Sequence, residues 1–317
     1  MTGTPTIALI IPTRDRPGFL DDAVASAVRT LARSGLDGEV VVVDNSSTDG
    51  LADEARAVAA LHGARFERSS PAGVSRARNV GLRTTDADLV AFLDDDDMYD
   101  DRFVETLVEV HRTNPGLAVA FGQLMMTDDQ LRPVFVPVPA GPFPSGEAYA
   151  FSLRTIVSWN ACLSRRAAVL EAGGFDETVT QSEDWDLQMR MSAQCDVAGV
   201  ETVVGYIRQH ARARPTYAQW LAVQHACRTV ERRGRRLEAR SRPSRWQRVM
   251  STWPHRGRSA DGALGHARAA VEAGDLVEAR RFVRGAAWRS LPHTIRLLPA
   301  YRDVFAAVVR PPRRSAA

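Results

Sequence analysis

Strand and helix patterns alternate along the first third of the chain, and this alternation restricts the fold more than any other feature. Short apolar runs predict buried strands at residues 6–11, 39–43, 64–67, 89–93 and 117–126. Apolar residues at helical spacing predict helices at residues 19–31, 50–61, 74–82 and 102–112. Strands that alternate with helices form a largely parallel sheet covered by helices. We therefore expect an α/β fold.

The sequence changes character after about residue 212, where arginine-rich helical patterns replace the alternation. We expect an α/β domain over residues 1–212 and an arginine-rich helical region over residues 213–317, with a linker at about 241–260. Within the second region, the pattern predicts a helix pair interrupted at Gly274 and Asp275.

The basic residues are unusual in type and in distribution. All 41 are arginines, which excludes a P-loop lysine and a Schiff-base lysine. Residues 228–258 hold eleven arginines but only two acids, Glu231 and Glu238. This segment is interpreted either as a solvated helix face with a linker or as a surface attracted to an anionic membrane.

Neither a membrane span nor a signal peptide is predicted. No stretch reaches the roughly 18 consecutive apolar residues of a span, and the N-terminus lacks a basic start followed by a long apolar run. We therefore expect a cytoplasmic protein, with peripheral contact at the inner face of the membrane as a second expectation.

Polar clusters follow three of the predicted strands at their carboxyl ends, where open parallel sheets bind ligands. They are Pro12-Thr13-Arg14, Asp44-Asn45-Ser46-Ser47 and Asp94-Asp95-Asp96-Asp97. The first two are also compatible with ordinary helix caps. Four consecutive carboxylates repel one another, so the third cluster predicts a bound divalent cation. An acidic loop that caps the following helix is the alternative.

A fourth acidic cluster, Ser182-Glu183-Asp184-Trp185-Asp186, begins a predicted helix. Acids in a first helical turn interact favourably with the helix dipole, so simple capping explains them. Acids downstream of an aspartate cluster also suit a general base beside a metal-bound substrate. Both interpretations stay open at this point.

Taken together, these clusters resemble the inverting glycosyltransferases of family 2. The match runs in order over about residues 5–212, through IIPTRDRPGFL, VVVDNSSTDG, GVSRARNVGL, AFLDDDDMY, SWNACLSRRAAVLEAGGFDE, SEDWDLQMRM and GYIRQH. The resemblance implies a GT-A fold with a single Rossmann-like, mostly parallel sheet flanked by helices. The C-terminal helical extension lies outside it.

The resemblance also implies which residues bind the nucleotide-sugar. Pro12, Thr13 and Arg14 would line the nucleotide pocket. Asp44 would accept a hydrogen bond from the base, with Asn45 and Asp49 beside it. The side chains of Arg78 and Asn79, in the sequence ARN, would face the nucleotide.

The metal site and the catalytic base are implied in the same way. Asp94 and Asp96 match the family's Asp-x-Asp, which contacts ribose and metal. The neighbouring Asp95 and Asp97 leave open which carboxylates of the run touch the ion. His210 matches an additional metal ligand. Asp184 matches the base, and the adjacent Glu183 is its alternative.

The implied reaction is metal-dependent, inverting transfer of a sugar from a nucleotide-sugar to a hydroxyl acceptor. The cofactor would be Mn²⁺ or Mg²⁺, and the donor a UDP-sugar, with thymine and guanine as open alternatives for the base. The acceptor would belong to a cell-surface polysaccharide, a glycolipid or a secondary metabolite.

Two other functions compete with this one. A nucleotidyltransferase would also use paired carboxylates and a metal, but it normally has a glycine-rich basic loop, and IIPTRDRPGFL contains one glycine. An inactive nucleotide-sugar-binding protein is the other, and the intact acidic clusters argue against it. Nucleic acid is not an expected partner, because Trp246 and Trp253 are the only aromatic residues of the arginine-rich segment.

Overall fold

The computed structural model describes residues 4–209, 215–241, 243–244, 246, 251 and 253–309. The chain divides into two compact units, the first within residues 1–210 and 236–242 and the second within residues 211–235 and 243–317. No helix in the described ranges is long and apolar enough to cross a membrane.

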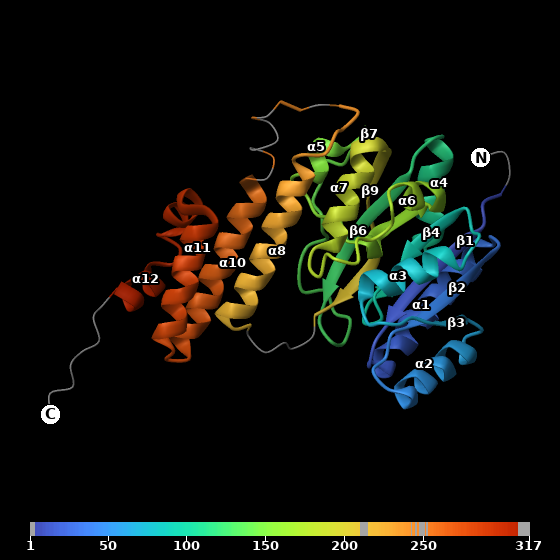
Figure 1. Ribbon diagram of the computed structural model, residues 1–317, viewed down its shortest axis with the longest axis horizontal. Coiled ribbons are helices and arrows are strands. Elements are labelled where there is room, and N and C mark those ends of the chain that lie inside the picture. The colour runs from blue at the N-terminus through green and yellow to red at the C-terminus, as the bar shows by residue number, and fades with distance from the viewer. Residues whose placement is uncertain are drawn as a thin grey trace. The chain divides into compact units, whose positions relative to one another are not determined.

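The first unit is built on a mixed sheet in the order β3-β2-β1-β4-β8-β6-β9-β5, with β7 paired to β9 (Figure 1). The strands are β1 (Ile7–Thr13), β2 (Gly38–Asp44), β3 (Arg65–Arg68), β4 (Leu89–Phe92), β5 (Met98–Tyr99), β6 (Val119–Thr127), β7 (Ser145–Glu147), β8 (Cys162–Arg165) and β9 (Asp196–Arg208). Strands β1 to β4 pair in parallel. This half confirms the expected α/β fold.

The second half of the sheet is mixed because β8 runs antiparallel to both of its neighbours, β4 and β6. Strands β6 and β9 pair in parallel, whereas β5 and β7 run antiparallel to β9. The sheet is therefore parallel from β1 to β4 and mixed beyond β4.

Helices flank this sheet and place the functional residues at its edge. They are α1 (Pro17–Ser34), α2 (Asp49–Leu61), α3 (Val74–Arg83), α4 (Phe103–Thr113), α5 (Tyr149–Ser152), α6 (Arg166–Glu171), α7 (Glu183–Gln194) and the 3-10 helix η1 (Trp159–Ala161). Helix α3 approaches β1 closely because Gly81 has no side chain. A Cβ there would lie 2.4 Å from Cγ2 of Ile10.

The second unit consists of helices α8 (Tyr217–Gly234), α10 (Trp253–Glu272), α11 (Leu276–Leu297) and α12 (Arg302–Val309) within the described residues. Its core contains Trp220, Leu264, Phe282 and Val304. The predicted helix pair is confirmed as α10 and α11, which meet at the left-handed Gly274 (φ 77°). Residues 253–260, expected in a linker, lie in α10.

Candidate active site

A cleft lies where β1, β2 and β4 end. It is lined by Pro12, Thr13, Arg14, Arg16, Asn45, Gly73, Val74, Ala77, Asp94 and Asp95. Because these strands are parallel neighbours, the polar residues that follow them meet at one edge of the sheet. The cleft thus brings together residues of the first three polar clusters.

Asp95 joins the end of β4 to the end of β1. Its Oδ2 accepts hydrogen bonds from Oγ1 of Thr13 at 2.7 Å and from the backbone N–H of Arg14 at 3.3 Å. Burial raises the pKa of Asp95 to about 6, although the charge of Arg16 and the Thr13 hydrogen bond act in the opposite direction.

Arg16 is a site residue to which the sequence analysis assigned no role. Its guanidinium lies 2.5 Å from Oδ1 of Asp95 and 2.5 Å from Oδ2 of Asp96. Arg16 lies two residues after Arg14 in the sequence IIPTRDRPGFL. Its position in this motif was the one sequence signal that could have marked it as a site residue. The aspartate run therefore has a cation of the protein itself beside it, which balances part of its negative charge.

Arg78 connects the aspartate run to the acidic start of α7. Its side chain is 3% exposed, and Nη2 lies 2.7 Å from Oδ1 of Asp94. Its Nη1 lies 3.0 Å from Glu183 Oε1 and 3.1 Å from Asp184 Oδ1. The guanidinium also lies over the ring of Phe175, 5.0 Å from its centroid. Two clusters about ninety residues apart in the sequence are thus held together by one buried cation.

The neighbouring Asn79 binds protein backbone. Its Nδ2 donates to the carbonyl of Phe175 at 2.8 Å, and its Oδ1 accepts from the N–H of Phe175 at 2.9 Å. Asn79 therefore secures the loop that carries Phe175 beneath Arg78. Neither Arg78 nor Asn79 is among the residues that line the cleft.

Asp184 is held from two sides. Arg78 pairs with its Oδ1, and the backbone N–H of Trp159 donates to its Oδ2 at 3.3 Å. The indole Nε1–H of Trp159 also donates to the backbone carbonyl of Asp184 at 3.0 Å. Burial raises the pKa of Asp184 to about 6, the charge of Arg78 lowers it, and the charges of Glu183 and Asp94 raise it further. A carboxylate with this pKa is ionised at neutral pH and still basic enough to accept a proton.

Asn160 is a second residue that the sequence analysis missed, and it orders the aspartate run. Its Nδ2 donates to Oδ2 of Asp97 at 2.5 Å, and its Oδ1 accepts from the N–H of Asp94 at 3.3 Å. The N–H of Arg208 donates to Oδ1 of Asp97 at 3.0 Å. Burial raises the pKa of Asp97 well above its ordinary value. Asp97 thus ties the end of β4 to η1 and β9.

Of the polar cluster that follows β2, Asn45 lines the cleft, whereas Asp44, Ser46 and Ser47 are not among its lining residues. Asn45 lines the cleft and ties two loops, with Nδ2 2.8 Å from the carbonyl of Ser69 and Oδ1 2.5 Å from the N–H of Gly73. Asp44 is buried and accepts a hydrogen bond from the N–H of Ser46 at 3.1 Å. Asp49 lies in the first turn of α2, and its side chain is 89% exposed.

The residues at the cleft fit a metal that is shared with a substrate. Among the described side chains, no group of three or more His, Cys, Asp or Glu is arranged to hold an ion. Mg²⁺ is usually held by one or two carboxylates together with substrate phosphates and water. Asp94 faces the cleft, and Asp96 lies close by in the same run. His210, the other predicted ligand, lies outside the described residues.

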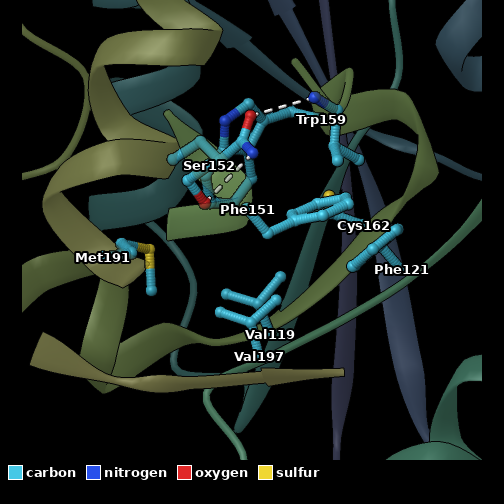
Figure 2. Close-up of a pocket in the computed structure, with 10 residues that line it drawn as sticks. Val119, Phe121, Phe151, Ser152, Trp159, Cys162, Met191 and Val197 are labelled. Atoms are coloured by element: carbon cyan, nitrogen blue, oxygen red, sulfur yellow. Dashed lines mark hydrogen bonds between the residues drawn. The ribbon is translucent and has the colours of Figure 1, made fainter. Parts of the chain in front are cut away.

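A second, smaller cavity lies in the apolar part of the first unit (Figure 2). Val119 and Phe121 of β6, Val197 of β9, and Trp159 are among its lining residues. Of the described side chains around it, Cys162 is the one that titrates, and burial raises the pKa of its thiol well above the ordinary value. The cavity thus lacks the charged groups that the cleft has.

Comparisons with known proteins identify the family of this chain. The model of glycosyl transferase family 2 matches residues 8–169, slightly more than half of the chain. Validoxylamine A glucosyltransferase of Streptomyces hygroscopicus subsp. limoneus is 31% identical over 109 residues, which are 34% of this chain and 24% of that protein. The chain thus matches about a quarter of that relative's length. An uncharacterized glycosyltransferase of Haemophilus influenzae is 20% identical over 231 residues, covering 64% of this chain and 76% of that protein.

Solved structures share the fold. S. aureus TarS 1-349 in complex with UDP-GlcNAc has a TM-score of 0.62 and 15% identity, covering 96% of this chain and 88% of that one. Mannosyltransferase PcManGT from Pyrobaculum calidifontis, in complex with GDP-Man and Mn²⁺, has a TM-score of 0.60 and 18% identity, covering 97% and 86%. With the family model matched across the strands that form the cleft, this chain belongs to glycosyl transferase family 2 and has the GT-A fold.

Proposed function

We propose that this enzyme binds a nucleotide-sugar in the cleft and transfers the sugar to a hydroxyl acceptor, with inversion at the anomeric carbon. The observation that supports this most directly is the placement of Asp184 by Arg78 beside Asp94, at the edge of the cleft. It puts a carboxylate of raised pKa next to the residues assigned to the donor. Similar folds with bound UDP-GlcNAc and GDP-Man support a nucleotide-sugar as donor.

Asp184 is the proposed general base. In the proposed reaction it takes the proton of the acceptor hydroxyl as that oxygen attacks the anomeric carbon and the diphosphate leaves. The backbone N–H of Trp159 holds one of its oxygens and leaves the other beside Arg78. A single displacement of this kind inverts the configuration of the transferred sugar. Glu183 is the alternative base, because it pairs with the same nitrogen of Arg78.

The donor is proposed to lie along the ends of β1, β2 and β4. Pro12, Thr13, Arg14 and Asn45 line that path and would contact the nucleotide. Asp44 and Asp49 are the proposed partners of the nucleotide base. Arg78 and Asn79 are proposed to support the nucleotide side of the site through their contacts with Asp94 and with the loop of Phe175. We propose a UDP-sugar, with dTDP- and GDP-sugars as the alternatives that a binding screen resolves.

The diphosphate is proposed to be held by Asp94 and Asp96 through Mn²⁺ or Mg²⁺, with Asp95 beside them. A bound divalent cation would neutralise the charge that develops on the leaving diphosphate. Arg16, which pairs with Asp95 and Asp96, places a further positive charge at the same position. His210 is retained as a proposed additional ligand.

The arrangement of the chain beyond the cleft is also proposed. Residues 1–212 would form the catalytic domain, and residues 213–317 a helical region outside the reaction. The exposed arginines within 228–258, among them Arg232, Arg233 and Arg236, would give peripheral contact with an anionic membrane. Polysaccharide, glycolipid and secondary metabolite remain the proposed acceptor classes.

The donor is tested by thermal unfolding of the full chain with UDP-, dTDP- and GDP-sugars in the presence of Mn²⁺. A ligand that binds only the folded state raises the unfolding temperature by mass action, so the pattern identifies the donor base. Absence of stabilisation by every nucleotide-sugar, with and without metal, would contradict the proposed function.

The base is tested by comparing Asp184→Asn with Glu183→Gln. Asp184→Asn keeps the shape of the side chain but cannot accept a proton, so turnover should fall by on the order of 10²–10⁴ while donor affinity changes little. Calorimetry measures donor affinity, and initial rates measure turnover. If Glu183→Gln loses turnover and Asp184→Asn keeps it, Glu183 is the base. If both keep it, the mechanism is wrong.

A further inference from the structure

The second unit contains a buried ion cluster that the reaction does not use. Glu231 of α8 is 1% exposed and lies at its centre. Its Oε1 is 2.5 Å from Nη2 of Arg256 on α10, and its Oε2 is 3.1 Å from Nη2 of Arg289 on α11. Arg235, the residue directly after α8, lies with its Nη1 3.5 Å from Oε1. Three guanidinium groups thus surround one carboxylate.

The charges of this cluster do not balance. Its four side chains carry three positive charges and one negative charge, because arginine remains protonated in proteins. Burial lowers the pKa of Arg289, and the charge of Arg256 lowers it further, against the effect of Glu231. Burial likewise lowers the pKa of Arg235, and neighbouring arginines add to this effect. Positive charge is therefore in excess at a partly desolvated position.

Arg289 also has hydrogen-bonding capacity that the described residues do not use. Its side chain is fully buried, and neither Nε nor Nη1 has an acceptor in the described part of the chain. A buried donor without an acceptor is costly, and native proteins rarely keep one. Arg235 and Arg256 have side chains 21% and 24% exposed, so the cluster has a side that faces solvent.

We propose that this cluster is a binding site for a phosphate group, which reaches it from the solvent side of Arg235 and Arg256. An anionic phosphate would offset the positive charge by which Arg256 and Arg289 exceed Glu231. Its oxygens match the fork of N–H donors that a guanidinium presents. A second phosphate site in the helical unit would be separate from the diphosphate position in the cleft.

The test is calorimetric titration of the full-length protein with inorganic phosphate, with potassium chloride as the control salt. Arg256→Gln removes one charged donor and should weaken phosphate binding by about 10- to 100-fold, the effect of losing a hydrogen bond to a charged group. Arg284→Gln is the matched control, because Arg284 lies on α11 like Arg289, is exposed and forms no ion pair with Glu231 among the described residues. It should leave the affinity within about twofold of the wild type.

A second variant keeps the test decisive if Arg256→Gln does not fold, as judged by circular dichroism. Arg235→Gln alters a partly exposed member of the cluster and should also weaken phosphate binding. Equal phosphate affinity in the wild type and the folded cluster variant overturns the proposal. So does a loss of phosphate binding in Arg16→Gln alone, because the ion then binds in the cleft. Absence of any phosphate binding by the wild type overturns it as well.

Vesicles distinguish the two sources of the phosphate group. If the natural ligand is a lipid headgroup, phosphatidic acid vesicles retain the wild type, phosphatidylcholine vesicles do not, and Arg256→Gln reduces retention more than Arg284→Gln. If the ligand is a soluble phosphate, calorimetric binding is lost in Arg256→Gln while vesicle retention is the same for both variants. Either result supports the site, and no difference between the variants in both assays overturns it.

Discussion

Replacing Arg78 by glutamine should move the acidic limb of the pH–rate profile to higher pH. Arg78 is the cation that pairs with Asp94, Glu183 and Asp184. Glutamine keeps much of the length of the side chain but removes the charge. Three carboxylates then face one another without it, and ionisation of Asp184 becomes harder.

The size of the shift follows from the geometry. At an effective dielectric constant of about 20, two charges about 4 Å apart interact by about 4 kcal/mol, which corresponds to about three pKa units. This is an upper limit, because the side chain of Asp184 is 20% exposed and solvent and side chains rearrange in the variant. We expect a shift of about one to two units. The limb should move from about 6 to about 7–8, and turnover at pH 7 should fall.

The same change has a defined effect on stability. Breaking a buried ion pair by removing one partner lowers the free energy of unfolding by about 3–5 kcal/mol. A carboxyl whose pKa is raised in the folded state stabilises the protein while it is protonated. That contribution is lost as the pH rises through the folded pKa. Urea unfolding of the Arg78→Gln variant should therefore show stability decreasing between about pH 4 and pH 8.

The assay is the initial rate at saturating donor between pH 5 and 9, with Arg76→Gln as the matched control. Arg76 lies on the same helix and pairs with Glu177, away from the acidic cluster, so its profile should stay near that of the wild type. A folded Arg78→Gln variant whose limb remains near 6 would refute the argument that Arg78 controls the ionisation of Asp184.

Removal of divalent cations with a chelator should abolish turnover and should also abolish the thermal stabilisation that the nucleotide-sugar gives. Full activity in excess chelator would disprove the metal assignment. Asp96→Asn should weaken both metal-dependent donor binding, measured by calorimetry, and turnover. Gly81→Ala should lower the free energy of unfolding by about 1–3 kcal/mol, because the methyl group of the alanine would overlap Ile10. Urea unfolding measures the effect, and Gly18→Ala is the control, because a Cβ at Gly18 meets no atom within 4 Å. Vesicle flotation should show that residues 228–258 favour anionic over neutral lipid, and equal flotation with both lipids would count against membrane contact.

Local sequence patterns were sufficient for the elements that make the cleft. β1 is buried along its whole length, and its apolar residues are consecutive, so the run is visible without a structure. The polar residues come directly after the strands, and parallel strands necessarily end at the same edge. The α/β fold and the meeting of Thr13, Asn45 and Asp95 were therefore predictable from the sequence.

The partners of the charged side chains were not predictable in this way. In the sequence, Arg78 is the arginine of an ordinary ARN triplet. In the structure it is buried and pairs with Asp94, after β4, and with two carboxylates at the start of α7. Arg16 pairs with carboxylates about eighty residues away in the sequence. Asn160, just before β8, forms hydrogen bonds with Asp94 and Asp97, which follow the neighbouring strand β4. Such contacts depend on the path of the whole chain, which no local pattern records.

The sequence by itself determined which residues are apolar, where the strands and helices of the parallel half of the sheet form, and which polar groups follow those strands. These are short-range properties, set by side-chain periodicity and backbone preference. Only the tertiary structure decided that β8 runs antiparallel beside β4, that Arg78 pairs with carboxylates of two acidic clusters, and that Glu231 pairs with three arginines. Ionic contacts depend on distance in space, and residues more than a hundred positions apart, such as Arg78 and Asp184, become neighbours only when the core has folded.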